Sequence, residues 1–293
     1  MSKFGFAKIV REKVVVPAIM QGDRIIPLGD LVAEVPTEAA LFANWDAWVD
    51  RVEKAIDDHV ASSDSWLSAD DVEFSIPGIE RPSIYGAGAN YRDHVLEMGK
   101  EVPDEAYHYI SPAGTLNYHR GAVIVPAGIT TLDWEVELVV VIGRAGKNIR
   151  REDALSHVAG YTVGNDFSSR GLQNRHPIFG MDWMKAKNRE GWNPVGPSIV
   201  PAKFIPDPSN LALSLSVNGV MRQDSTTAQF IVDIPRQIEA LSSYITLNPG
   251  DLILTGTPSG TAIASGQYLS DGDVTVASVQ VIGQLINTVT FTA

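Results

Sequence analysis

The sequence predicts an α+β protein that is mostly β, with a small N-terminal α/β module joined to a larger β-rich domain. Three observations support this expectation. One stretch near the N-terminus has the spacing of an amphipathic helix, short β-rich runs dominate the later part of the chain, and turn residues cluster between the two parts. We place the boundary in this cluster, so that the module spans residues 1–78 and the larger domain residues 79–293.

The N-terminal module is expected to combine short strands with one helix. Val14–Val16 and Arg24–Ile26 are short apolar runs on either side of a turn at Gly22 and Asp23. From about residue 36 to residue 60, apolar side chains recur at spacings of three and four, which is typical of a helix with one buried face. These apolar positions are Leu41, Phe42, Trp45, Trp48, Val49, Val52, Ile56 and Val60.

The larger domain is expected to consist mainly of strands, because short apolar, β-branched runs alternate with turn residues throughout it. The expected strands are residues 122–125, 134–142, 211–217, 252–254, 274–281 and 284–291. One helix is expected to begin near Asp233, since aspartate caps helices well and Pro235 is tolerated in a first turn.

Composition and charge exclude several classes of protein. The chain has no cysteine, which excludes a disulfide framework, a thiolate zinc site and a cysteine nucleophile. Its formal net charge of -12 repels nucleic-acid backbones and anionic lipid, so we expect neither as a partner. Residues 1–8 lack an apolar run of signal-peptide length, and no stretch approaches the roughly 20 apolar residues of a membrane span. We therefore expect a cytoplasmic protein.

Two glutamates on the expected strand 134–142 point to a cation site. Residues two apart on a strand share a face, so Glu135 and Glu137 point the same way. A solvated polar face is the alternative, but Val139 and Val141 continue that face and favour burial. Buried anions need a compensating cation, and this stretch contains no lysine or arginine. A divalent metal would satisfy both carboxylates.

Asp166 offers a third carboxylate for the same site. Three carboxylate oxygens suit a hard cation such as Mg²⁺, Mn²⁺ or Ca²⁺ better than zinc. If the segment after Asp166 is helical, Arg170 and Gln173 share its face at i+4 and i+7. They would then either form a surface pair with Asp166 or hold a substrate carboxylate beside the metal. Lys187 is a second candidate for such an anchor.

His94 and Glu97 form a candidate acid–base pair. At a spacing of three they are neighbours on a helical turn, where a carboxylate orients the imidazole and favours proton uptake. A surface ion pair is the alternative from spacing alone. The nearby Gly86 and Gly88 do not indicate a dinucleotide site, because Tyr91 stands where the third glycine of that fingerprint would be.

Several motifs resemble those of the fumarylacetoacetate hydrolase family. Residues 90–98 resemble its N-Y-x-x-H-x-x-E-M motif, residues 133–138 its D-[YW]-E-x-E-L metal strand, and residues 164–173 its N-D-x-[ST]-x-R-x-x-Q segment. Further matches, in family order up to the C-terminus, are Trp183, Lys187, residues 194–197, 218–219, Gln223, and residues 248–260 and 271–273.

This resemblance implies a mixed β-sandwich roll, a homodimer, and Mg²⁺ or Mn²⁺ on Glu135, Glu137 and Asp166. It implies that catalysis involves His94, Glu97 and Lys187. The residues implied in substrate binding are Tyr91, Arg92, Arg170, Gln173, Lys187 and Thr257. Two departures concern the pocket walls: Ser111 stands where a lysine is frequent, and residues 186–192 differ from the family's G-K-S-F-D-T-F stretch.

The predicted function is hydrolysis of a C–C bond in a small 2,4-diketo acid, with a cation stabilising the enolate that develops. Decarboxylation or tautomerisation of an oxaloacetate-like keto acid and isomerisation of a dienoate are the alternatives on the same site. A non-catalytic, metal-stabilised binding protein is disfavoured, because a binding module has no need of a base such as His94 beside a metal.

Overall fold

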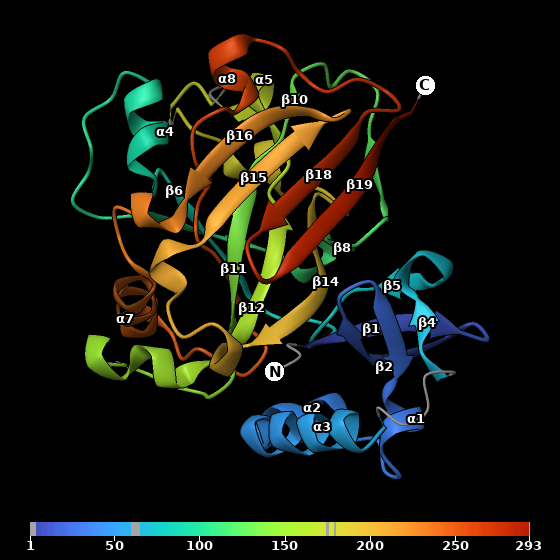
Figure 1. Ribbon diagram of the computed structural model, residues 1–293. Helices are drawn as coiled ribbons and strands as arrows, with labels where there is room; N and C mark the ends of the chain where they lie inside the picture. The colour runs from blue at the N-terminus through green and yellow to red at the C-terminus, as the bar shows by residue number, and fades with distance from the viewer. Residues whose placement is uncertain (1–3, 60–64, 174–175, 179, 293) are drawn as a thin grey trace.

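The computed structural model describes residues 4–59, 65–173, 176–178 and 180–292. Within them a large mixed sheet has the strand order β4-β3-β2-β1-β14-β12-β11-β17-β6-β7, with β5 paired to β1 and β8 to β14. A five-stranded sheet, β16-β15-β18-β19-β9, packs in front of β11, β12 and β14 (Figure 1). The prediction of a mostly β protein built from mixed sheets is confirmed.

The N-terminal module contains β1 (Gly5–Arg11), β2 (Val14–Gln21), β3 (Arg24–Pro27), α1 (Leu28–Leu31), α2 (Glu38–Ala43), α3 (Trp45–His59), β4 (Leu67–Ser68) and β5 (Glu73–Ser75). As predicted, a turn at Gly22 and Asp23 joins two strands, β2 and β3. The module lies to one side of the rest of the molecule (Figure 1). Its first strand nevertheless pairs with β14 through Phe6 and Ile199, so the main sheet crosses the expected boundary at residue 78.

The single helix expected over residues 36–60 is wrong: two helices, α2 and α3, occupy this stretch and meet at Asn44. The side chain of Thr37 caps α2 by accepting a hydrogen bond from the backbone N–H of Ala40. Asn44 ends α2 with φ -131° and ψ 38°, and its side chain donates to the carbonyl of Ala40. Such local side-chain bonds compete with a continuous helix. Val60 lies outside the described residues.

The larger domain contains the remaining strands, which are β6 (Ile84–Gly88), β7 (Tyr107–Ser111), β8 (Leu116–Tyr118), β9 (Ala122–Val125), β10 (Leu132–Asp133), β11 (Val136–Ile142), β12 (Val158–Asn165), β13 (Ser168–Ser169), β14 (Asn193–Pro201), β15 (Ala212–Val217), β16 (Val220–Thr226), β17 (Leu252–Leu254), β18 (Val274–Val279) and β19 (Gly283–Phe291). Its α-helices are α4 (Arg92–Glu97), α5 (Arg170–Gln173), α6 (Trp183–Lys187), α7 (Ile234–Tyr244) and α8 (Ala262–Ser265). Short 3-10 helices lie at Ala69–Asp71, Ala113–Thr115, Arg151–His157, Ala202–Phe204, Pro208–Asn210 and Thr227–Gln229. The helix expected near Asp233 is α7, which this aspartate caps by accepting from the N–H of Arg236.

The register between β11 and β12 positions the carboxylates. β11 is fully buried between β12 and β17, and Val136 pairs with Asn165 at the end of β12. The next residue of the chain, Asp166, donates its backbone N–H to the carbonyl of Glu135 at 2.9 Å. This pairing brings a residue 29 to 31 positions later in the sequence beside both glutamates. In the described residues, no helix is both long and apolar enough to cross a membrane.

The folded state is expected to lose stability in mild acid through His119. This side chain is 6% exposed, its Nδ1 accepts from the N–H of Ile286 at 3.2 Å, and its ring packs edge-on against Phe74 of the N-terminal module. Burial, with the charge of Arg120 acting in the same direction, lowers the pKa of His119 to about 4. In the unfolded chain a histidine titrates near 6.5. Between about pH 4 and pH 6.5 this histidine is therefore protonated in the unfolded chain and neutral in the folded chain, which favours unfolding as the pH falls.

The contribution of neutral His119 to the free energy of unfolding should be fully present above about pH 6.5. It should fall by roughly 2–4 kcal/mol as the pH is lowered to about 4. Urea unfolding of the wild type and of His119→Gln at pH 7, 5 and 4 measures this. The variant should lose clearly less stability over the range, because it removes the titrating group. An identical pH dependence in both proteins would contradict the assignment.

Candidate metal centre and active site

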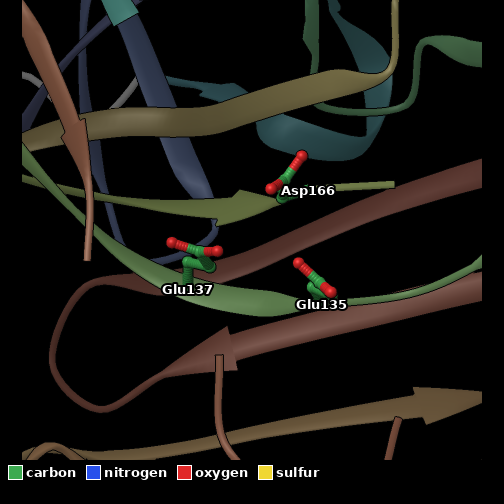
Figure 2. A group of neighbouring side chains, drawn as sticks. All are labelled: Glu135, Glu137 and Asp166. Carbon is green, nitrogen blue, oxygen red and sulfur yellow. The ribbon is translucent and has the colours of Figure 1, made fainter. Parts of the chain in front are cut away.

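Glu135, Glu137 and Asp166 form one buried group of carboxylates. Each offers an oxygen within 4.8 Å of the others, and all three side chains are buried. Figure 2 shows Glu135 and Glu137 extending from the same side of their segment toward the neighbouring segment that carries Asp166. Glu135 directly precedes β11 rather than lying within it, yet it still shares a side with Glu137.

Two cations reach this group from elsewhere in the chain. Lys187 donates to Glu135 at 2.6 Å and also to Asp166, while Arg170 donates to Asp133 at 2.7 Å and to Glu135. The sequence stretch around the two glutamates lacks cations, but the folded site contains two, so part of the negative charge is balanced without a metal. Both cationic side chains are almost fully buried, at 8% exposed for Arg170 and 4% for Lys187.

The balance of charge still favours a divalent cation. If all four carboxylates are ionised, the two cationic side chains leave two negative charges in a buried site. The unbalanced negative charge lies mainly at Glu137, which accepts a hydrogen bond from the backbone N–H of Gly256 at 2.7 Å instead of contacting Arg170 or Lys187. Burial, together with the charges of Asp166 and Glu135, raises the pKa of Glu137 well above its usual range. A bound Mg²⁺ or Mn²⁺ would neutralise these charges, and the all-oxygen donor set suits both ions.

Tyr109 is a residue of the site that sequence reasoning missed. Its hydroxyl donates to Asp166, and Asn193 donates to the other oxygen of that carboxylate at 2.7 Å, so both orient a candidate ligand. Tyr109 pairs with Gly86 on the neighbouring strand, where a Cβ would lie only 2.2 Å from the tyrosine ring. The signal available in the sequence was the alternation of Tyr107 and Tyr109 on a strand facing a glycine-rich one.

His94 and Glu97 lie on α4, as the sequence spacing predicts. Nδ1 of His94 is 3.4 Å from Oε2 of Glu97, and the imidazole is 6% exposed. Glu97 in turn accepts the backbone N–H of Gly260, at 3.0 and 3.1 Å to its two oxygens. A carboxylate fixed in this way holds the orientation of the ring and leaves Nε2 as the nitrogen that Glu97 does not engage.

A cavity of about 430 Å³ brings most of the predicted site residues together. Those that line it are His94, Glu135, Arg170, Gln173, Lys187 and Thr257. The lining does not include Glu97, Glu137, Asp166, Tyr91 or Arg92. Tyr91 is buried against Phe230, and its hydroxyl has no hydrogen-bond partner among the residues that the structure describes; Arg92 is exposed. A substrate-binding role for these two residues remains a prediction.

The segment directly after Asp166 is not helical, so the condition for placing Arg170 and Gln173 on one helical face with Asp166 is not met. Ser168–Ser169 form strand β13, which pairs with β10, and α5 begins only at Arg170. This strand pairing overrides the helical spacing and turns Arg170 toward Asp133 and Glu135 rather than toward Asp166. Gln173 remains beside it and accepts from Nη1 of Arg170 at 3.3 Å.

The two places where the sequence departs from the family pattern, Ser111 and the stretch 186–192, contact each other. Ser111, at the end of β7, donates its hydroxyl to the side-chain oxygen of Asn188 at 2.6 Å. Asn188 also donates to the carbonyl of Ile110 and is the last, capping residue of α6. This pair therefore ties β7 to the helix that carries Lys187 into the site.

Comparison with known proteins agrees with this geometry. The family described as Fumarylacetoacetate (FAA) hydrolase C-terminal matches residues 83–290. The homoprotocatechuate catabolism bifunctional isomerase/decarboxylase of Escherichia coli is 40% identical over 217 residues, which are 73% of this chain and 48% of that protein. Oxaloacetate tautomerase fahd2, mitochondrial, of Xenopus laevis is 33% identical over 274 residues, which are 92% of this chain and 84% of that protein.

A solved structure combines a similar fold with a metal. Fumarylpyruvate hydrolase from Pseudomonas aeruginosa, in complex with Mn²⁺ and pyruvate, superposes with a TM-score of 0.67 at 31% identity, over 73% of this chain and 91% of that one. The relatives are enzymes, although the chain spans about half the length of the Escherichia coli protein. The extent of the match over residues 83–290 shows that the chain belongs to the fumarylacetoacetate hydrolase family.

Proposed function

We propose that the chain is a metal-dependent hydrolase that cleaves a C–C bond in a small 2,4-diketo acid. One observation carries the proposal: a buried histidine oriented by a carboxylate lines the same cavity as Glu135, a member of the carboxylate group that suits a divalent cation. Mg²⁺ or Mn²⁺ would be held by Glu135, Glu137 and Asp166. When bound, the cation supplies Lewis-acid polarisation of the substrate's keto oxygens. The Mn²⁺ and pyruvate in the fumarylpyruvate hydrolase structure support this choice.

His94 is the general base of the proposed reaction. It takes a proton from water while the water oxygen bonds to C4 of the diketo acid. The C3–C4 bond then breaks, and its electron pair moves to C3, giving the enolate of the 2-oxo acid. His94 returns the proton to C3, so that one 2-oxo acid and one carboxylic acid leave. Glu97 keeps the imidazole oriented and stabilises its protonated form.

Arg170, Gln173 and Lys187 are proposed to hold the acid end of the substrate. In the structure Arg170 and Lys187 contact carboxylates of the protein. A divalent cation on those carboxylates would weaken the hold of Glu135 and Asp166 on Lys187. Its ammonium could then turn to a substrate carboxylate, while Arg170 keeps the planar fork that favours bidentate contacts.

A second candidate function is tautomerisation or decarboxylation of a keto acid, and it is favoured by two relatives. The Escherichia coli protein is named an isomerase/decarboxylase and the Xenopus laevis protein an oxaloacetate tautomerase. The same base and cation would enolise such a keto acid without the attack of water on a second carbonyl.

The proposal is tested with a panel of acylpyruvates, their methyl esters, oxaloacetate and a 2-hydroxydienoate, each with Mg²⁺, with Mn²⁺ and with chelator. We expect equimolar 2-oxo acid and carboxylic acid from an acylpyruvate, loss of turnover in chelator, and recovery on adding either metal. The methyl ester should be a poor substrate, because it lacks the negatively charged carboxylate that Arg170 and Lys187 are proposed to bind. Undiminished turnover in chelator, or turnover of oxaloacetate alone, would count against the hydrolase.

We also propose a homodimer with a cytoplasmic location, acting on a small keto acid and not on nucleic acid or membrane. Light scattering of the purified protein should give about twice the 31.7 kDa mass of one chain at working concentrations. A single-chain mass throughout would contradict the dimer.

A further inference from the structure

The part of the cavity that the proposed chemistry does not use is apolar. Beyond the groups assigned to the metal, the base and the acid end, the wall is made largely of aliphatic and aromatic side chains. The apolar side chains of this wall include Ala89, Met98, Tyr107, Met181, Trp183 and Ile263. These residues come from three separate regions: the turn and helix around α4, the β7–α6 wall, and α8.

The aromatic side of this wall is preorganised. Trp183 stacks on Tyr107 with ring centroids 5.7 Å apart and on Tyr109 with centroids 5.1 Å apart, the latter at an interplanar angle of 3°. The Ser111–Asn188 hydrogen bond fixes α6, which carries Trp183, against the strand of both tyrosines. A flat, fixed aromatic surface binds apolar groups with little loss of side-chain freedom.

The described lining residues provide no uncommitted cation. Arg170 and Lys187 are the only lysine or arginine side chains among them. Arg170 donates to Asp133, Glu135 and Gln173, and Lys187 donates to two carboxylates of the metal group. A carboxylate transferred from water to an apolar wall needs a partner charge, and the acid end of the substrate already uses both cations that the described lining residues provide.

The mouth of the cavity exposes large apolar groups to water. Tyr107 is 54% exposed, Met181 43% and Ile263 39%, and all three line the cavity. Apolar side chains gathered at the rim of a hollow indicate that an apolar ligand group covers them.

We propose that the substrate is a monocarboxylic 2-oxo acid whose end remote from the acid group is an uncharged alkyl or aryl tail, bound by Met98, Met181, Trp183 and Ile263. This inference rests on the proposed function for the 2-oxo acid group, and it adds what the remote end must be.

The test compares two ligands of equal length that lack a 4-keto group and so cannot undergo the proposed cleavage: 2-oxooctanoate and 2-oxooctanedioate. Their affinities for the full-length protein loaded with Mn²⁺ are measured by calorimetry. We expect the monocarboxylate to bind at least about thirtyfold more tightly, because the dicarboxylate buries an unpaired charge.

A variant should move this preference in a defined direction. Met181→Arg places a cation at the rim and should shift the affinity ratio toward the dicarboxylate by at least about tenfold. Ile263→Arg does the same from α8, in case the first variant does not fold. Met184→Arg is the matched control, because Met184 is 64% exposed on α6 but does not line the cavity. The ratio of affinities for the two acids should therefore be the same in this variant as in the wild type.

The outcomes separate this inference from the hydrolase proposal. Cleavage of 2,4-dioxooctanoate, measured alongside, tests hydrolysis and does not enter the affinity ratio. A strong preference for the monocarboxylate without cleavage would support the apolar subsite and overturn the hydrolase. Equal or tighter binding of the dicarboxylate by the wild type would overturn the subsite even if cleavage occurs. Absence of binding by both acids would overturn the subsite, and absence of cleavage as well would overturn both.

Discussion

Replacing Glu137 by glutamine is expected to abolish metal-dependent turnover and, in the absence of metal, to make the protein more stable. Glu137 is 1% exposed, and within the described residues no cationic side chain forms an ion pair or hydrogen bond with it. Its negative charge is therefore costly until a cation binds. Glutamine removes this charge yet can still accept the N–H of Gly256 through its amide oxygen. Turnover should fall roughly a thousandfold or more, because a ligand of the Lewis acid is lost.

Urea unfolding in chelator and in Mn²⁺ measures the stability part of this prediction. In chelator the variant should exceed the wild type by about 1–3 kcal/mol. At a free Mn²⁺ concentration 100 times its dissociation constant the wild type should gain about 2.7 kcal/mol, and the variant much less, so the order reverses. Glu101→Gln, at an exposed position, is the control and should show neither effect. A variant that is less stable than the wild type in both conditions would show that Glu137 is a purely structural residue.

Replacing His94 by alanine is expected to separate hydrolysis from decarboxylation. Only hydrolysis requires water to attack a second carbonyl, and His94 is the base that lines the cavity with a carboxylate partner. Hydrolysis of the diketo acid should fall by about a hundred- to ten-thousandfold. Any decarboxylation of oxaloacetate should survive better. Glu97→Gln should show the same pattern more mildly, because it keeps a hydrogen-bond partner and removes the charge.

Both reactions are measured in the wild type, in His94→Ala and in Glu97→Gln at saturating metal. The Michaelis constants should change little, since neither residue is proposed to anchor the substrate. Equal losses in the two reactions would show that the pair serves a shared enolisation step. The preference for a dedicated hydrolase would then lose its mechanistic basis, and a tautomerase or decarboxylase would explain the site better.

The local periodicity of the sequence predicted the parts of the fold that short-range physics controls. The two-residue repeat placed Glu135 and Glu137 on one side, and Asp233 and Pro235 marked the start of α7. Periodicity failed at Asn44, where a single side chain interrupts a pattern that is otherwise helical over residues 36–60. It also failed after Asp166, where the pairing of β13 with β10 outweighs helical spacing.

The chemistry of the site depends on contacts that no local pattern contains. Lys187 reaches Glu135 across 52 positions of sequence, and Tyr109 reaches Asp166 across 57. Such contacts follow from the order of strands in the sheet, which spacing along one segment cannot reveal. The family resemblance predicted Lys187 as a site residue, but it did not predict Tyr109. Neither the resemblance nor the spacing indicated that Arg170 would contact Asp133.

The central claim is that Glu135, Glu137 and Asp166 bind one divalent cation. A titration of the metal-free protein with Mn²⁺, followed by electron paramagnetic resonance, counts bound ions directly and does not depend on knowing the substrate. We expect one saturable Mn²⁺ per chain in the wild type and in His94→Ala, competition by Mg²⁺, and loss of this binding in Glu137→Gln. No saturable binding by the wild type, or equal binding by wild type and Glu137→Gln, would contradict it.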